Sequence, residues 1–178
     1  MSLLERMKGG DGAPRGHSHP NPNPNPNPFP IISSIHFFFF FSLVTSFSVD
    51  GQDVVYKDII EPLESVSVSI TTTDKATIDD FGPPEEIAST LASKVLTPAS
   101  QQVKILSVSR RLVDGRPYVD FEFASKASTY IRHALASVSV ANGKFYTLTT
   151  GANELRRWGK VKGTLESVVA SFKVVDRY

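Results

Sequence analysis

The chain has 178 residues, a formal net charge of +1 and no cysteine, so we expect one domain without disulfides, a thiol nucleophile or a cysteine-based zinc site. Residues 50–99 hold ten acidic and three basic side chains, whereas residues 100–178 hold six and thirteen. This balance lacks the continuous basic face of a nucleic-acid binder; we expect the two halves to pair within the fold, with a charged docking face as the alternative.

Residues 1–48 are predicted to be a tail, and residues 49–178 the domain. Four Asn-Pro pairs at 21–28 favour extended chain, and five phenylalanines follow at 37–41. Residues 31–44 are long enough for a signal-peptide core, and the uncharged stretch reaches the ~20 residues that cross a bilayer, but a polar interruption and phenylalanine in place of leucine argue against both. The codons for Phe, Leu, Ser and Pro are pyrimidine-rich, and the codons for Phe-Ser-Val at 47–49 can include the CAG of a splice acceptor. We therefore interpret the tail as translated intron or upstream sequence. A real export signal is the alternative.

Two strands are predicted at the start of the domain. Residues 53–60 (DVVYKDII) form the first, which Pro62 closes. Residues 64–72 (ESVSVSITT) form the second, because valine and isoleucine alternate with serine and give it one buried face. The first strand opens the domain without an earlier neighbour, so we expect the sheet to lack its beginning.

A helix is predicted over residues 83–96, after a polar connection that ends at Gly82. Prolines and two glutamates suit its first turn. Its apolar side chains form one stripe, which we expect to face the sheet: Ile87, Ala88, Leu91 and Val95.

The second half of the domain predicts two hairpins and a final helix. Residues 102–113 and 117–125 are joined at Asp114-Gly115, and residues 130–141 and 144–150 at Asn142-Gly143. Residues 158–172 predict a helix whose inward side chains are Trp158, Val161, Leu165, Val168, Val169 and Phe172. The fold class is therefore α+β, an antiparallel sheet covered by helices.

No catalytic or cofactor-binding residue is assigned. The G-x-S-x-G elbow and the Gly-rich phosphate loops are absent. His133, the domain's only histidine, is expected to be structural, and the histidines of the tail are too scattered for a zinc site. Two carboxylate pairs are expected to be structural. We expect Asp79 and Asp80 to be helix caps rather than cation ligands, and Asp120 and Glu122 to form an exposed strand face paired with Lys or Arg rather than an acid–base pair.

One cluster favours protein contact, namely the basic residues around Trp158: Arg156, Arg157, Lys160 and Lys162. Arginine and tryptophan are enriched at binding hot spots. In the alternative interpretation, Trp158 anchors the core and the basic side chains are solvated.

Long segments of the domain resemble the PsbP-domain family of thylakoid-lumen proteins, related to the extrinsic PsbP subunit of photosystem II. The segments are VVYKDIIEPLESVSVSI, FGPPEEIASTL, DGRPYVDFEF, RHALASVSVANGKFYTLTTGANE and RRWGKVKGTLESVVASFK, in the family's order over residues 50–173. The resemblance is to the PsbP-like accessory proteins rather than to PsbP itself.

The resemblance implies an α/β/α sandwich in the chloroplast thylakoid lumen with no catalytic residues. Such a protein is a monomer, peripheral to the membrane, that contacts photosystem complexes and assists photosystem II assembly, repair or the stability of the oxygen-evolving complex. Weak association with Ca²⁺ or Mn²⁺ is implied only by the resemblance. A small ligand-binding or enzymatic α+β domain on the same scaffold is the alternative, and a deep apolar pocket with convergent polar groups would favour it.

Three departures from the family pattern stand out. The family reads GANERRW where this chain reads GANELRRW, and the added Leu155 rotates a helix start by ~100°. Either a loop absorbs it or Trp158 loses its place. The family's β-hairpin ahead of GQDVVYKD is missing. The family's transit peptides commonly carry twin arginines, but both Arg-Arg pairs here, at 110–111 and 156–157, lie within the domain, so no transit peptide is recognised.

Overall fold

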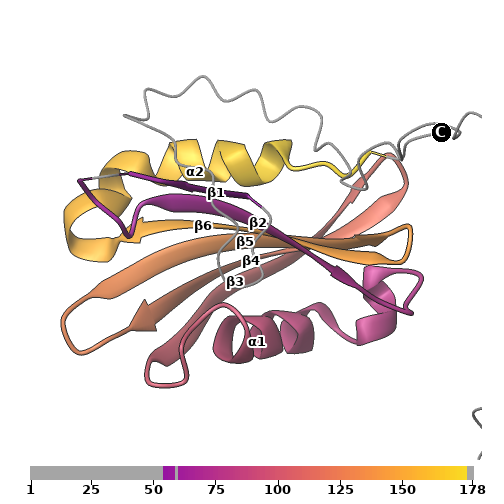
Figure 1. The fold of residues 1–178 in the computed structure, drawn as a ribbon, viewed down its shortest axis with the longest axis horizontal. Helices are drawn as coiled ribbons and strands as arrows, with labels where there is room; N and C mark the ends of the chain where they lie inside the picture. The colour runs from indigo at the N-terminus through magenta and orange to yellow at the C-terminus, as the bar shows by residue number, and fades with distance from the viewer. Residues whose placement is uncertain (1–53, 59, 176–178) are drawn as a thin grey trace, which may run out of the picture. The chain divides into compact units, whose positions relative to one another are not determined.

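A six-stranded antiparallel sheet forms the middle of the fold in the computed structural model, which describes residues 54–58 and 60–175 (Figure 1). The tail predicted over residues 1–48, with His17, His19 and His36, lies outside the described residues. In chain order the elements are β1 (Val54–Lys57), β2 (Ser65–Thr72), a 3₁₀ turn η1 (Ile78–Phe81), α1 (Pro84–Lys94), β3 (Gln102–Val113), β4 (Arg116–Lys126), β5 (Ile131–Ala141), β6 (Lys144–Asn153), a π-helical turn η2 (Glu154–Trp158) and α2 (Gly159–Ser171).

The strand order is β1-β2-β6-β5-β4-β3. Strands β3 to β6 form a meander, and the predicted turns join two of its hairpins, with positive φ at Asp114 (51°), Gly115 (78°), Asn142 (51°) and Gly143 (69°). Strand β2 pairs with β6, and β1 pairs with β2 at one edge of the sheet. The chain then crosses one face through η1 and α1 to reach β3 at the opposite edge.

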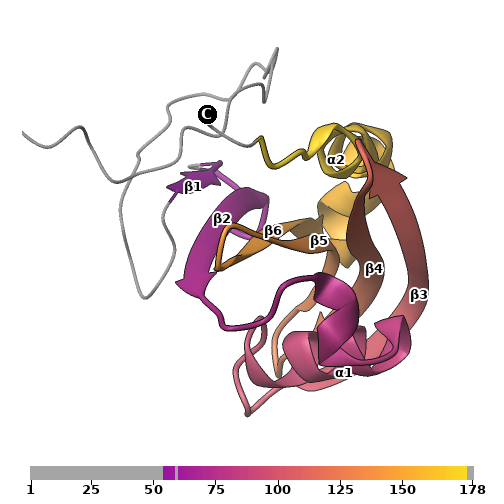
Figure 2. The ribbon, with the colours of Figure 1, turned by 90° about the vertical axis from the view of Figure 1, so that its right-hand side faces the viewer.

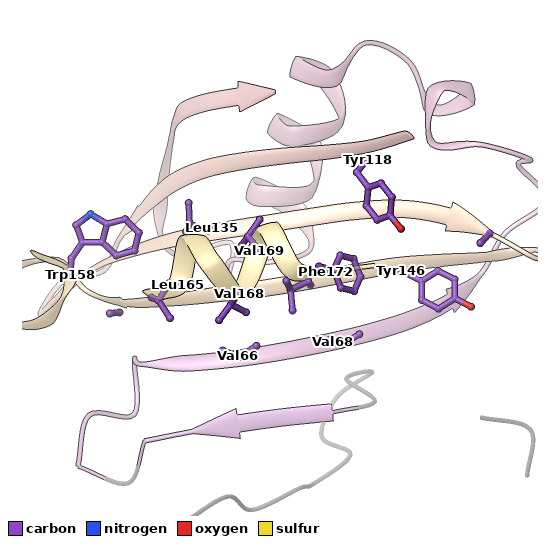
Figure 3. Packing of buried hydrophobic residues seen from close by; sticks show 13 residues of the cluster. Val66, Val68, Tyr118, Leu135, Tyr146, Trp158, Leu165, Val168, Val169 and Phe172 are labelled. Carbon is purple, nitrogen blue, oxygen red and sulfur yellow. The ribbon is translucent and has the colours of Figure 1, made fainter. Parts of the chain in front are cut away.

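The two helices lie on opposite faces of the sheet, as Figures 1 and 2 show from two sides. The predicted α+β fold with α/β/α layering is therefore confirmed. Figure 3 shows the core beneath α2, where the predicted inward side chains meet residues of β2, β4, β5 and β6. A second core lies beneath α1, where Ile87, Ala88 and Ala92 pack among phenylalanines and valines of β4 and β5.

Helix α1 corrects one prediction from the sequence. Val95 was expected on the buried stripe, but 66% of its surface is exposed. The helix ends at Lys94, so its periodicity does not extend to Val95, and Ala92 is buried in the stripe instead.

The C-terminal end of α2 is held by Arg111 of β3. Its Nη2 donates hydrogen bonds to the carbonyl oxygens of Val169 (3.2 Å) and Phe172 (3.0 Å), which lie at the helix end. Its Nε lies 2.5 Å from Asp120 Oδ2, and its guanidinium stands 4.5 Å from the centre of the Tyr118 ring. A charge-assisted bond thus satisfies carbonyl groups that a helix end leaves without intrahelical partners and fixes α2 against the sheet.

Candidate protein-contact surface at the start of the last helix

The added Leu155 is absorbed by the π-helical turn η2. A π turn closes its hydrogen bonds from residue i to i+5, and so holds one residue more than an α turn. Asn153 starts the turn, because its side-chain oxygen accepts hydrogen bonds from the backbone N–H groups of Leu155 and Arg156, both at 3.1 Å. Leu155 is 85% exposed, whereas Trp158 is only 8% exposed. The sequence predicted that a loop would absorb the residue or that Trp158 would lose its place; a π turn absorbs it instead, and Trp158 stays buried.

Trp158 anchors a stack on the sheet. Its ring lies parallel to that of His133, with ring centroids 3.9 Å apart and 8° between the planes. His133 Nε2 lies 2.6 Å from Glu122 Oε1, so His133 contacts both an aromatic ring and a carboxylate of the fold. Lys162 Nζ lies 3.7 Å from the same carboxylate oxygen and 5.8 Å from the centre of the Trp158 ring. Lys162 is therefore engaged within the fold.

The strand face that holds Asp120 and Glu122 pairs with basic groups, as predicted, but it is not exposed. Asp120 pairs with Arg111, and Glu122 with His133 and Lys162. Helix α2 lies above this face, so both carboxylates are half-buried. The prediction of an exposed face was wrong because the alternation in β4 does not indicate that the second helix covers the polar face as well.

Two arginines of η2 pair with the connection between β1 and β2. Arg157 Nε lies 2.8 Å from Glu64 Oε2, and this hydrogen bond raises the pKa of Arg157. Arg156 reaches Glu61 at 3.8 Å, with 71% of its side chain exposed. The acidic first half and the basic second half of the chain therefore pair here, in agreement with the expectation that the two halves pair within the fold.

The four predicted contact residues thus divide into two pairs. Arg157 and Lys162 are bound to carboxylates of the fold. Arg156 is mostly exposed, and Lys160 is exposed and makes no ion pair with the described residues. Together with Leu155, these two side chains form a small surface of one apolar and two cationic groups, which we call the η2 patch (Leu155, Arg156, Lys160).

Within residues 54–58 and 60–175, no group of three or more histidine or carboxylate side chains is placed to hold a metal ion. Asp80 accepts hydrogen bonds from the N–H groups of Ala76 (3.0 Å) and Thr77 (2.9 Å), and Asp79 pairs with Arg110 at 2.7 Å. Asp80 therefore caps η1, the turn that contains it, and not the helix after Gly82 for which the pair was expected as caps, while Asp79 forms an ion pair. Neither helix within residues 54–58 and 60–175 is long and apolar enough to span a bilayer.

Comparison with known proteins extends the sequence resemblance. The PsbP family profile matches residues 41–174. PsbP-like protein 1, chloroplastic, of Arabidopsis thaliana is 56% identical over 126 residues, covering 71% of this chain and 54% of that protein. Photosynthetic NDH subunit of lumenal location 1, chloroplastic, of the same plant is 35% identical over 130 residues, covering 73% and 54%. This chain therefore spans about half the length of both plant relatives.

Cyanobacterial proteins match a larger share of their own length. CyanoP of Thermosynechococcus vestitus is 32% identical over 133 residues, covering 70% of this chain and 72% of that protein. The solution structure of CyanoP from Synechocystis sp. PCC 6803 is similar to the present fold, with a TM-score of 0.61 and 29% identity over 75% of this chain and 80% of that one.

Proposed function

Because the chain belongs to the PsbP family, we propose that it is a non-catalytic accessory protein of photosynthetic complexes in the chloroplast thylakoid lumen. The single observation that carries this proposal is the 56% identity with PsbP-like protein 1, chloroplastic, over 126 residues. The protein acts through protein contacts, as a monomer peripheral to the membrane. Its partner is photosystem II, where it assists assembly, repair or the stability of the oxygen-evolving complex.

A second complex is a candidate partner on a specific observation. One relative is named as a lumenal subunit of the photosynthetic NDH complex, and it is 35% identical over 130 residues. The relative with the higher identity, PsbP-like protein 1, carries no complex in its name, so photosystem II is proposed from the family resemblance alone. Binding to the two complexes, each isolated, separates these partners.

The η2 patch is the surface through which we propose docking. Its two cations stand beside an exposed leucine, and acidic lumenal surfaces would attract them. Exposed charges are screened over ~8 Å at physiological salt, so binding should weaken as salt rises. Lys162 is unsuited to a charge reversal, because it is less exposed (43%) and a glutamate there would face two carboxylates, Glu122 and Glu166. Arg156 is 71% exposed, so a glutamate at that position can turn into solvent away from Glu61.

The test is a double variant, Arg156→Glu with Lys160→Glu, in a binding assay with isolated photosystem II membranes. We expect binding about tenfold weaker at low salt and a smaller difference at high salt, as for two docking charges worth ~0.7 kcal/mol each. The matched control is Lys75→Glu with Lys104→Glu, which reverses two exposed lysines away from α2. Equal binding of both variants would exclude the η2 patch, and absence of binding by the parent would refute the photosystem II proposal.

A further inference from the structure

A groove opens on the α1 side of the sheet, over the half that α1 leaves uncovered. Helix α1 packs on β3 and β4. On β2, Val66 and Val68 point into the core beneath α2, so the serines between them face the other side. Ser65, Ser67 and Thr149 form the floor of the groove, which has a volume of about 280 Å³.

The side chain of Arg132 lies within this groove, across β6. Its Nη2 donates a hydrogen bond to Ser65 Oγ (3.2 Å), and its Nε to the carbonyl oxygen of Leu63 (3.4 Å). Gly151 of β6 makes the necessary space, since a Cβ atom at Gly151 would lie only 2.9 Å from the guanidinium carbon of Arg132 and 2.5 Å from the His133 carbonyl oxygen. The hydrogen bonds to Ser65 and Leu63 hold the guanidinium in the space that Gly151 leaves open.

Arg132 has no countercharge among the residues that the structure describes. No carboxylate of these residues lies within 4.0 Å of its guanidinium, and the groove is lined by two cations, Arg132 and Lys57, and by no Asp or Glu. Four other arginines, in contrast, pair with carboxylates: Arg110, Arg111, Arg156 and Arg157. Burial lowers the pKa of Arg132 to about 10, so the side chain remains charged at neutral pH. A partly buried charge that meets neutral oxygen atoms but no countercharge is costly in a fold, and an anionic ligand would supply the countercharge.

We propose that this groove binds the carboxylate of an apolar monocarboxylic acid or of a peptide C-terminus. The carboxylate lies on the Arg132 guanidinium, where the serine hydroxyls of the floor can donate further hydrogen bonds. Of the two cations that line the groove, Lys57 is exposed to solvent and only Arg132 is partly buried, so one negative charge on the ligand balances the partly buried cation. The apolar part of the ligand contacts Val95 and Leu96, and this contact accounts for the exposure of the Val95 side chain. This binding site goes beyond the proposed docking function and does not depend on which complex the protein joins.

The test is an NMR titration of the full chain with isovalerate, with isovaleramide as the uncharged probe of the same shape. We expect isovalerate to shift the signals of the Arg132 Nε–H group and the Gln101 side-chain amide saturably, and isovaleramide to leave them unchanged. Arg132→Gln should weaken isovalerate binding at least ~10-fold, because it removes a charge-assisted contact. The control Lys104→Gln, which removes an exposed cation outside the groove, should bind like the parent.

A second variant guards against a fold effect at Arg132. Ser67→Phe fills the groove from its floor and leaves Arg132 in place, so it should also abolish binding while the fluorescence of Trp158 stays that of the folded chain. Two peptides distinguish a peptide C-terminus from a small acid as the source of the carboxylate: Gly-Gly-Val with a free C-terminus, and the same peptide amidated. Their affinities are compared with that of isovalerate. Tighter binding of the free peptide than of isovalerate assigns the site to a protein terminus, and the reverse assigns it to a small acid. Equal responses to isovalerate and isovaleramide, tighter binding of inorganic phosphate, or binding retained by both variants would overturn the proposal.

Discussion

Deletion of Leu155 tests whether the π turn absorbs the added residue. Because Leu155 is 85% exposed, its removal takes almost no apolar surface out of the core. A chain shortened by one residue can close an α turn between Asn153 and Trp158, and one residue fewer must be ordered, which is worth about 1–2 kcal/mol. Part of this gain is lost if one of the two hydrogen bonds to the Asn153 side chain does not re-form. We expect the free energy of unfolding to stay unchanged or to rise by up to ~1 kcal/mol.

Urea denaturation followed by Trp158 fluorescence measures this directly, because Trp158 is the chain's single tryptophan. The matched control deletes Val161, inside α2, which rotates every later side chain by ~100° relative to η2. Leu165, Val168 and Phe172 would then leave the core at ~1.5 kcal/mol or more each, so the control should lose at least ~4 kcal/mol. A loss of more than ~1 kcal/mol on deleting Leu155, or a red-shifted emission in its folded state, would refute the π-turn argument.

Two further predictions concern stability. Gly163→Ala should raise the free energy of unfolding by ~0.5–1 kcal/mol, since Gly163 is exposed within α2 and a Cβ there meets no atom within 4 Å; an unchanged or lower urea midpoint would contradict this. The hydrogen bond from Arg110 lowers the pKa of Asp79, so this pair stabilises the fold above the unfolded pKa of ~3.9 and the contribution is lost as pH falls through the lower folded value. The urea midpoints of the parent and Asp79→Asn should therefore differ slightly at pH 6 and converge towards pH 2.5, and a difference that grows on acidification would exclude this role.

The sheet could be predicted closely because each strand carries its own local signal. The alternation in ESVSVSITT and the positive-φ dipeptides at Asp114-Gly115 and Asn142-Gly143 depend on neighbouring residues alone. The end of α1 was less predictable, because Val95 fits the helical period and only the backbone after Lys94 shows that the helix has stopped. The π turn has no periodic pattern in sequence, and the comparison of GANELRRW with the family's pattern predicted only that a loop absorbs Leu155 or that Trp158 loses its place.

The candidate sites depend on contacts between distant residues, which the sequence does not reveal. That Arg157 is neutralised by Glu64 follows from the position of the β1–β2 connection beside η2. The groove around Arg132 is formed by side chains from several strands and by a missing Cβ at Gly151, and no local motif joins these features. The position of Arg132 next to Gly151 depends on the pairing register of β5 and β6, which the sequence alone does not give.

The strand order also bears on how the chain folds. The meander from β3 to β6 is built from tight connections, whereas β2 reaches β6 over a long stretch of chain, as between Ser65 and Thr150, 85 positions apart. Closing a loop of that length costs about 4 kcal/mol in chain entropy, beyond the cost common to all loops. We infer that the meander forms first and that the β1–β2 hairpin docks onto β6 late. Changes at the Asn142-Gly143 turn would then slow folding, while changes where β2 meets β6, the floor of the groove, would mainly speed unfolding. The groove would accordingly be the last part of the sheet to form and the first to open. A ligand bound there would therefore lower the unfolding rate of the native state.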